Sequence, residues 1–330
     1  MTLDLKDFAR SVEVRVPAST SNLGSGFDCC GLALNLYLTV RASINPCGVP
    51  CIVETFDERD SNIIPRDQEN LIYKAMRLVA EREGFELPPV RLEIENEIPF
   101  ASGLGSSGAA IVAGLSLFSE LMEQELSVEK LLRYATELEG HADNVAAALL
   151  GSLVINCTKE DGEVLGVKCP WPRDIKVIAV SPQFQVVTKF ARSILPDSVS
   201  RRDLVYNLQR VALFGAAFLN GDYELLWEAM KDQVHQPLRA QLVPGLREAL
   251  DTTKMTGLLG IALSGSGPTV VALATTNFEE IGQRIASAFH ERQLATTIRI
   301  LEVETEGVKT KMGPRIELAK SGAGVNQPHF

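Results

Sequence analysis

The sequence predicts an α+β protein built from two domains. Its 330 residues are more than one simple core usually organises, so two domains are the natural expectation. In the second half the patterns follow the order strand, helices, strand, helix, strand, which is typical of an α+β domain. Residues 169–172 read Cys-Pro-Trp-Pro, and two prolines interrupt any helix or strand that would cross them. We therefore expect domains at 1–168 and 169–305, and a partly irregular tail at 306–330.

The first domain is expected to open with two strands and to continue with helices. Residues 12–16 alternate between apolar and charged side chains, as a half-buried strand does, and Pro17 is expected to end that strand. Residues 18–31 are small, polar and glycine-containing, which indicates a loop. A helical pattern from about Glu69 to Glu83 ends at Gly84. The other elements expected here are strands at 34–40, 90–94 and 153–156 and helices at 109–122 and 128–139.

The second domain is expected to begin with a strand at 175–180. Three helical stretches follow, and glycine and serine at 264–268 indicate a turn between strands. The helical stretches lie near 202–217, 222–233 and 244–256, and the last elements are a strand at 269–274, a helix at 278–292 and a strand at 297–303.

Charge and cysteine usage exclude several classes of function. With 32 basic against 42 acidic residues the formal net charge is −10, and no basic block appears that would hold a nucleic acid by its phosphates. The six cysteines and four histidines lack zinc-ligand spacing, so we expect reduced thiols. The first ten residues contain no apolar signal-peptide core, and no apolar run is long enough to span a membrane. We expect a cytoplasmic protein without a membrane partner.

A glycine- and serine-rich segment directly before a helix is the main functional feature. Gly103 and Gly105 let the backbone approach a ligand closely, and Ser106 and Ser107 are expected to cap the helix. Free N–H groups at a helix amino terminus, together with its positive dipole end, form a site for phosphate. We therefore favour a phosphate loop over a simple capped helix. The segment is not a Walker P-loop, and although Gly108 completes the string G-x-G-x-x-G, the two helices that follow do not fit a Rossmann unit.

Three further segments carry polar residues in unusual density. Residues 139–144 read Glu-Gly-His-Ala-Asp-Asn, which favours a functional site over a polar helix end. In that interpretation Glu139 binds Mg²⁺, His141 and Asn144 contact the substrate, and Asp143 orients His141. Residues 19–28 and 263–269 are turn-rich segments whose sequences alone do not distinguish a site from an ordinary loop.

Together the four segments resemble the GHMP kinases. The three motifs of that family match in order at residues 17–28, 99–109 and 263–268, and the resemblance extends from about residue 11 to about residue 305. Within the family, PASTSNLGSGFDCCGLAL and EGHADNVAAALLG resemble the homoserine kinase branch, and the stretches at 188–196 and 237–240 agree with it. Ala142 and Gly108 stand where many members have proline and alanine, and neither departure removes a polar group.

The resemblance implies a fold and a reaction. The N-terminal domain should be like ribosomal protein S5 domain 2, the C-terminal domain should be ferredoxin-like, and ATP and substrate should bind in the cleft between them. The reaction would be transfer of the γ-phosphate of ATP to the side-chain hydroxyl of L-homoserine, giving O-phospho-L-homoserine in threonine biosynthesis. The implied partners are this small-molecule substrate and, since homodimers occur in the family, a second copy of the chain.

On the substrate side, the resemblance assigns charges that match a zwitterionic amino acid. Asp28 would bind the ammonium group, and Arg192 and Arg239 would clamp the carboxylate. The remaining polar atoms and the hydroxyl would be held by Asn22, His141 and Asn144. Phosphoryl transfer depends mostly on alignment and charge neutralisation, so the identity of a base stays open between Asp28 and His141, with Arg192 as a further catalytic candidate.

On the nucleotide side, ATP and Mg²⁺ are the implied cofactors. Ser107 and Glu139 are the expected metal ligands, Asn70 matches the family's adenine contact, and Lys189 is a weaker candidate for phosphate charge. The phosphate site would be formed by Pro99, Ala101, Ser102, Gly103, Leu104, Gly105, Ser106 and Ser107.

Alternatives to this interpretation remain. A sister kinase acting on mevalonate or shikimate would keep the phosphate loop, but its substrate has no amine and would not need Asp28. A non-catalytic nucleotide-binding sensor on the same fold could lose its metal ligands, whereas Ser107 and Glu139 are both present. An NAD-dependent oxidoreductase is disfavoured, because the chain lacks a suitable acidic residue after the next strand.

Overall fold

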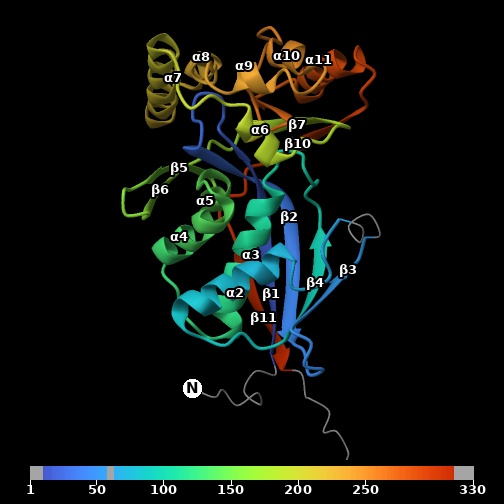
Figure 1. The fold of residues 1–330 in the computed structure, drawn as a ribbon. Coiled ribbons are helices and arrows are strands. Elements are labelled where there is room, and N and C mark those ends of the chain that lie inside the picture. Colours follow the sequence, from blue (N-terminus) through green and yellow to red (C-terminus); the bar gives the residue numbers. More distant parts are fainter. Residues whose placement is uncertain (1–9, 58–62, 316–330) are drawn as a thin grey trace, which may run out of the picture.

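Two sheets, one above the other in Figure 1, organise the chain. The structure is a computed structural model and describes residues 10–57 and 63–315. The larger sheet has seven strands and the smaller has four. Among the described residues, no helix combines the length and apolarity that a membrane crossing requires.

The larger sheet is built around two long antiparallel strands. Its order is β11-β1-β2-β4-β3, and a hairpin of β5 and β6 joins the amino-terminal end of β2. Only β3 and β4 pair in parallel; the other described pairs of this sheet are antiparallel. The strands are β1 (Arg10–Ser21), β2 (Cys30–Ile44), β3 (Cys51–Thr55), β4 (Val90–Asn96), β5 (Leu153–Thr158), β6 (Val164–Cys169) and β11 (Lys309–Arg315).

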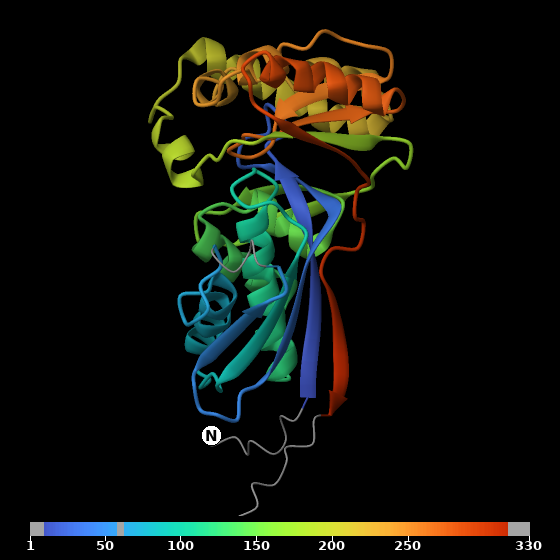
Figure 2. The ribbon, with the colours of Figure 1, turned by 90° about the vertical axis from the view of Figure 1, so that its right-hand side faces the viewer.

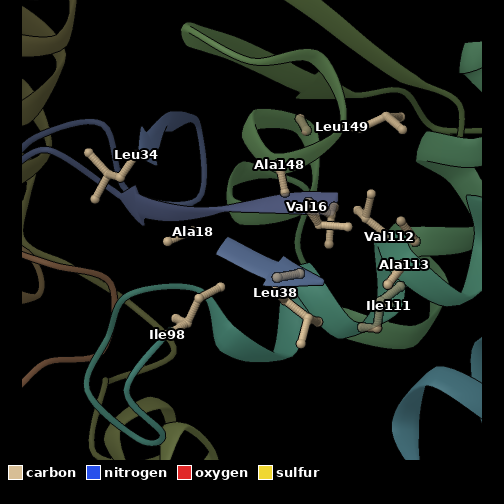
Figure 3. Close-up of a cluster of buried hydrophobic side chains, with 14 of the residues drawn as sticks. Val16, Ala18, Leu34, Leu38, Ile98, Ile111, Val112, Ala113, Ala148 and Leu149 are labelled. Carbon is tan, nitrogen blue, oxygen red and sulfur yellow. The ribbon is translucent and has the colours of Figure 1, made fainter. Parts of the chain in front are cut away.

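Four helices cover one face of this sheet, as the side view in Figure 2 shows. They are α2 (Leu71–Glu83), α3 (Ser106–Leu121), α4 (Val128–Glu139) and α5 (Asp143–Leu150). Helix α3 lies between the sheet and the other helices and is therefore apolar on nearly every side, whereas α4 has a polar outer face. Figure 3 shows Ile111, Val112 and Ala113 of α3 in the core cluster with Val16 of β1.

The smaller sheet has the antiparallel order β10-β7-β9-β8. Numbered by their order in this half of the chain, the strands run 4-1-3-2, as expected for a ferredoxin-like domain. Its strands are β7 (Lys176–Pro182), β8 (Leu258–Leu263), β9 (Val270–Ala274) and β10 (Thr296–Leu301). Its helical elements are α6 (Thr188–Ser193), α7 (Arg201–Asn220), η2 (Tyr223–Leu225), α8 (Leu226–Ala229), α9 (Gln236–Arg239), α10 (Leu246–Leu250) and α11 (Phe278–His290).

The expectation that Pro17 ends the first strand is wrong. A bulge between Pro17 and Ala18 shifts the register, and β1 then continues to Ser21 by pairing with residues 31–34 of β2. Proline lacks an N–H group but is tolerated at such a bulge. The small polar residues of this stretch are buried rather than exposed, so the predicted loop shrinks to about residues 22–29.

The chain crosses between the sheets twice. The predicted boundary at 169 falls on the last residue of β6, just before the chain passes to β7, and the domain limits themselves stay a prediction. After β10 the chain returns to the larger sheet, where Val303 bridges Leu34 and β11 pairs with β1. Part of the segment expected as an irregular tail is thus a strand, and residues 316–330 lie outside the described residues.

Candidate active site

A polar cavity of about 110 Å³ lies where the loops of the two sheets meet. Its walls come from the ends of β1 and α4, the beginnings of α3 and α5, the short helices α6 and α9, and the turn after β8. Segments from far apart in the sequence therefore supply one cavity. Its lining includes Ser21, Asn22, Asp28, Pro99, Ala101, Ser102, Gly103, Leu104, Gly105, Ser106, Ser107, Glu139, His141, Asp143, Asn144, Thr188, Arg192, Arg239, Gly265 and Ser266.

The amino terminus of α3 faces this cavity without a side-chain cap. Gly105 occupies the cap position with φ of 72°, in the left-handed region that favours glycine, and makes no side-chain cap bond. The expectation that Ser106 and Ser107 cap α3 is therefore wrong, because both belong to its first turn. The first amide groups of α3 are left for an anion at the positive end of the helix.

Ser107 and Glu139 form the metal-binding candidate. The Ser107 hydroxyl donates a hydrogen bond of 2.7 Å to Oε2 of Glu139. Burial raises the pKa of Glu139 above its ordinary value, although the Ser107 hydrogen bond opposes that shift. A bound cation would compensate the partly buried carboxylate, and a hydroxyl with a carboxylate beside phosphate oxygens is the hard oxygen set that Mg²⁺ takes. These residues fit the metal.

A second cavity of about 280 Å³ opens beside the first and is mainly apolar. The two cavities share Ala101, Ser106 and Ser107. A flat apolar base could thus lie in the second cavity while its phosphates reach α3. The remaining wall is formed by Leu38, Ile63, Ile64, Pro65, Asn70, Leu71, Ile72, Ile94, Asn96, Phe100 and Ala110.

Asn70 lines this second cavity, but its amide is already used by the chain. Its Oδ1 accepts from the N–H of Ile72 at 2.9 Å as the cap of α2, and its Nδ2 donates to the carbonyl of Pro65 at 2.9 Å. The geometry makes Asn70 the residue that shapes the cavity wall between Pro65 and α2.

His141 is held by Asp143, as the sequence suggested. Helix α4 ends before Gly140 and α5 begins at Asp143, so His141 lies in the link between them. Its Nδ1 is 2.6 Å from Oδ1 of Asp143, whose side chain is 1% exposed. Burial lowers the pKa of His141, but the hydrogen bond and the charge of Asp143 raise it, and the net pKa lies above its ordinary value. This contact leaves Nε2 as the ring nitrogen free to meet a ligand.

Asp28 and Arg192 are paired with each other across the cavity. Arg192 Nη1 and Nη2 donate to Oδ2 and Oδ1 of Asp28, each at 2.8 Å. That bidentate bond raises the pKa of Arg192. The Arg192 side chain is 42% exposed and the Asp28 side chain is 33% exposed, so the pair can open to a ligand at modest cost. The residues expected to bind opposite ends of an amino acid therefore bind each other in its absence.

Arg239 is a buried cation that lacks an acidic partner. The residue is 2% exposed, and among the described residues no carboxylate lies within salt-bridge distance. Burial and the nearby charge of Arg192 lower the pKa of Arg239 to about 10. Its guanidinium still remains protonated near neutral pH. An uncompensated buried charge at a cavity wall favours an anionic ligand.

Asn22 and Asn144 line the cavity, yet their amides mainly tie its walls together. Asn22 Nδ2 donates to the Gly265 carbonyl at 3.0 Å, and its Oδ1 accepts from the N–H of Asp28 at 3.1 Å. Asn144 Oδ1 accepts from Ser19 and its Nδ2 donates to Ser21, both at 2.9 Å. The asparagines therefore fix the positions of the charged groups.

The structure brings together all but two of the candidate residues in the first cavity. Asn70 belongs to the second cavity, and Lys189 is exposed on α6 and lines neither. Sequence reasoning missed the apolar wall of the second cavity and the buried His235. A usable signal for His235 was its spacing of four residues, one helical turn, before Arg239.

Comparison with known proteins gives a consistent result. A model of the GHMP kinase N-terminal domain matches residues 70–152, and a model of the C-terminal domain matches residues 215–291. The chain is 41% identical to a homoserine kinase of Desulfitobacterium hafniense over 90% of its length and 98% of the relative's, and 40% identical to one of Aquifex aeolicus over 90% and 99%.

Solved structures agree with these matches. The crystal structure of homoserine kinase from Cytophaga hutchinsonii matches with a TM-score of 0.81 and 30% identity, over 94% of this chain and 99% of that one. The mevalonate kinase of L. major, solved with R-mevalonate, matches with a TM-score of 0.62 at 20% identity, over 91% and 96%. At that identity the second likeness concerns the fold alone.

Proposed function

The chain belongs to the GHMP kinases and, within them, to the homoserine kinases, and from this membership we propose the roles of its residues in an ATP-dependent phosphorylation. The reaction transfers the γ-phosphoryl group of ATP to the side-chain hydroxyl of L-homoserine and gives O-phospho-L-homoserine, a step of threonine biosynthesis. One observation carries the assignment of substrate: the carboxylate of Asp28 and the guanidinium groups of Arg192 and Arg239 line the same small cavity as the amino terminus of α3.

Three charged groups match the substrate's zwitterion. Asp28 binds the ammonium group, while Arg192 and Arg239 bind the carboxylate through guanidinium donors. Support comes from the Asp28–Arg192 pair. The ammonium group of a zwitterion can take the place of Arg192 at Asp28, and its carboxylate can take the place of Asp28 at Arg192. Mevalonate and shikimate carry a carboxylate but no amine, so either would leave Asp28 without a cation.

The phosphate side is supported by α3 and by the Ser107–Glu139 pair. The amide groups of the first turn of α3 hold the phosphates, and Ser107 with Glu139 holds the metal. Magnesium bound with ATP neutralises charge on the phosphates and aligns the transferred group. The base of ATP lies in the apolar cavity next to Asn70.

Asp28 is the better candidate to accept the hydroxyl proton. The pKa of His141 lies above its ordinary value, which favours the protonated ring, and a protonated ring donates hydrogen bonds but cannot act as a base. His141 therefore orients the hydroxyl or stabilises negative charge on the transferred group. Asp28 has two oxygens, one for the ammonium group and one for the proton.

The test is ADP release by the purified protein with Mg-ATP and one candidate alcohol at a time. The panel is L-homoserine, D-homoserine, L-serine, mevalonate and shikimate. We expect turnover with L-homoserine, and far less with its enantiomer, because the ammonium and carboxylate then cannot meet Asp28 and the arginines together. Turnover with mevalonate or shikimate instead would overturn the roles assigned to the residues that bind the substrate. ATP binding without turnover on any of these alcohols would favour a non-catalytic nucleotide-binding sensor.

The cellular location and the oligomeric state stay proposals. A cytoplasmic location is supported by the six cysteines, which are all free thiols. A homodimer is proposed from the family alone.

A further inference from the structure

A buried histidine that none of the roles above uses lies one helical turn before Arg239. His235 is 0% exposed, and its ring stacks on Phe27 with the centroids 5.1 Å apart. Phe27 directly precedes Asp28 in the loop between β1 and β2. A fully buried imidazole needs partners for both ring nitrogens, and these partners reveal its state.

The partner of Nε2 defines the tautomer. Nε2 lies 2.9 Å from the carbonyl oxygen of Gly24, and a carbonyl oxygen can only accept, so Nε2 carries the proton. Complete burial, as the largest cause, lowers the pKa of His235, which favours the neutral ring. In a neutral ring with Nε2 protonated, Nδ1 is an acceptor. Arg239 Nη1 donates to it at 3.4 Å.

Asp232 does not convert this ring into an ion pair. Its Oδ2 is 3.7 Å from Nε2 of His235, but the carboxylate is taken up by the start of α9. Oδ2 accepts from the backbone N–H groups of His235 and Gln236, at 2.9 and 2.7 Å, and Oδ1 accepts from Asn207 at 2.6 Å. Asp232 therefore anchors the backbone that carries His235.

Three neutral acceptors fix one side of the Arg239 guanidinium. Nη1 donates to His235 and to the carbonyl of Gly265, the latter at 2.9 Å, and Nε lies 3.4 Å from the carbonyl of Ala191. Nη2 donates to none of these groups, and Arg239 lines the cavity. Every hydrogen-bond acceptor of the guanidinium is neutral, so no acid binds it directly, and the charges of Asp28, Asp232 and Asp143 act on it only at longer range.

We propose that His235, as the neutral Nε2–H tautomer, is a positioning residue for carboxylate recognition that fixes Arg239 without neutralising it. A carboxylate in its place would also hold Arg239 but would cancel its charge. This inference rests on the proposed function, in which Arg239 binds the substrate's carboxylate.

The test compares two variants with two ligands. His235→Gln can still donate to Gly24 from the position of Nε2 but offers no acceptor near Nδ1, whereas His235→Asn can present its carbonyl oxygen near Nδ1. The ligands are L-homoserine and 3-aminopropan-1-ol, which is homoserine without its carboxylate. Steady-state kinetics give KM and kcat for homoserine and KM for ATP, and competition gives the inhibition constant of the amino alcohol.

We expect His235→Gln to lower kcat/KM for L-homoserine about 10- to 150-fold, as for loss of a hydrogen bond to a charged group, mostly through KM. The inhibition constant of 3-aminopropan-1-ol and KM for ATP should change less than about twofold, and His235→Asn should recover much of the loss. Equal losses for both ligands would show a merely structural role and overturn the proposal, as would no loss for either.

A measurement on the unaltered protein keeps the inference testable if a variant fails to fold. Nitrogen-15 NMR with labelled histidine should show one ring whose Nε2 is protonated and whose Nδ1 is not, across the neutral pH range. A protonated Nδ1 on His235 would overturn the proposal. Failure of the unaltered enzyme to phosphorylate L-homoserine would instead refute the proposed function, so the two failures are distinguishable.

Discussion

Asp28→Asn should weaken the binding of an amino acid, and should leave unchanged or strengthen the binding of the same molecule without its amine. The substitution keeps the shape of the side chain but removes the charge that Arg192 meets in a bidentate pair. In the unaltered enzyme an amine-free ligand must take Arg192 from Asp28 and leave that carboxylate unpaired. In the variant Arg192 is already free.

The magnitude follows from two opposing contributions. A hydrogen bond between the substrate ammonium and a carboxylate contributes about 1.5 to 3 kcal/mol. The Asp28–Arg192 pair, with side chains 33% and 42% exposed, contributes up to about 1 kcal/mol, and the variant no longer has to break it. The net loss is about 0.5 to 3 kcal/mol, a factor of about 2 to 150 in kcat/KM for L-homoserine. Loss of a proton acceptor would appear in addition as a kcat at least about tenfold lower.

The assay measures kcat/KM for L-homoserine, KM for ATP, and the inhibition constant of 4-hydroxybutyrate, which is homoserine without its amine. KM for ATP should stay unchanged, because Asp28 lies on the substrate side of the cavity. The inhibition constant of 4-hydroxybutyrate should stay equal or fall. If both ligands bind more weakly by the same factor, Asp28 does not recognise the ammonium group, and the charge assignment of the cavity is wrong.

Three further predictions concern the metal, the junction between the sheets, and pH. Glu139→Gln should raise the Mg²⁺ concentration for half-maximal activity at least about tenfold, in a titration at fixed ATP; an unchanged requirement would remove Glu139 from the metal site. Gly24→Ala should lower the free energy of unfolding by about 2 to 5 kcal/mol, because its Cβ would lie 1.8 Å from a backbone carbonyl oxygen at φ of 82°. Gly84→Ala is the matched control, because Gly84 has φ of 76° and open space around it. That variant should lower the free energy of unfolding by about 1 to 2 kcal/mol. The pKa of His141 in the folded protein is raised above its ordinary value of 6.5. The stability advantage of the unaltered protein over His141→Gln should therefore be full below about pH 6.5 and decline as pH rises through the folded pKa. Denaturation between about pH 5 and about pH 8 that shows the opposite trend contradicts the Asp143 contact.

Local patterns in the sequence predicted the parts of the fold that depend on local interactions. Helices α2 and α4 end at Gly84 and Gly140 in the left-handed conformation, which is a signal that glycine gives directly. The phosphate loop was predicted because its glycines and serines are contiguous. Strand β3 and the strand at 309–315 were missed, because each is defined by pairing with a distant partner rather than by its own pattern.

The candidate site was predicted as a set of residues but not as an arrangement. The charges of Asp28, Arg192 and Arg239 indicated a zwitterion, yet nothing local showed that the first two would pair while the third stays buried without an acid. Asn70 and Asn144 stay predicted ligand contacts, and what the sequence did not reveal is that their amides also hold backbone and serine groups. The partners of these amides lie 2 to 125 residues away, and no short motif can reveal the distant contacts of Asn144 with Ser19 and Ser21.

The most direct test of the account is a crystal structure of the protein with Mg²⁺, a non-hydrolysable ATP analogue and L-homoserine. The account predicts the ammonium group at Asp28, the carboxylate at Arg192 and Arg239, and the hydroxyl facing the terminal phosphate at the start of α3. It also predicts the metal at Ser107 and Glu139. An amino acid bound with its ends reversed, or an intact Asp28–Arg192 pair beside bound homoserine, would contradict it.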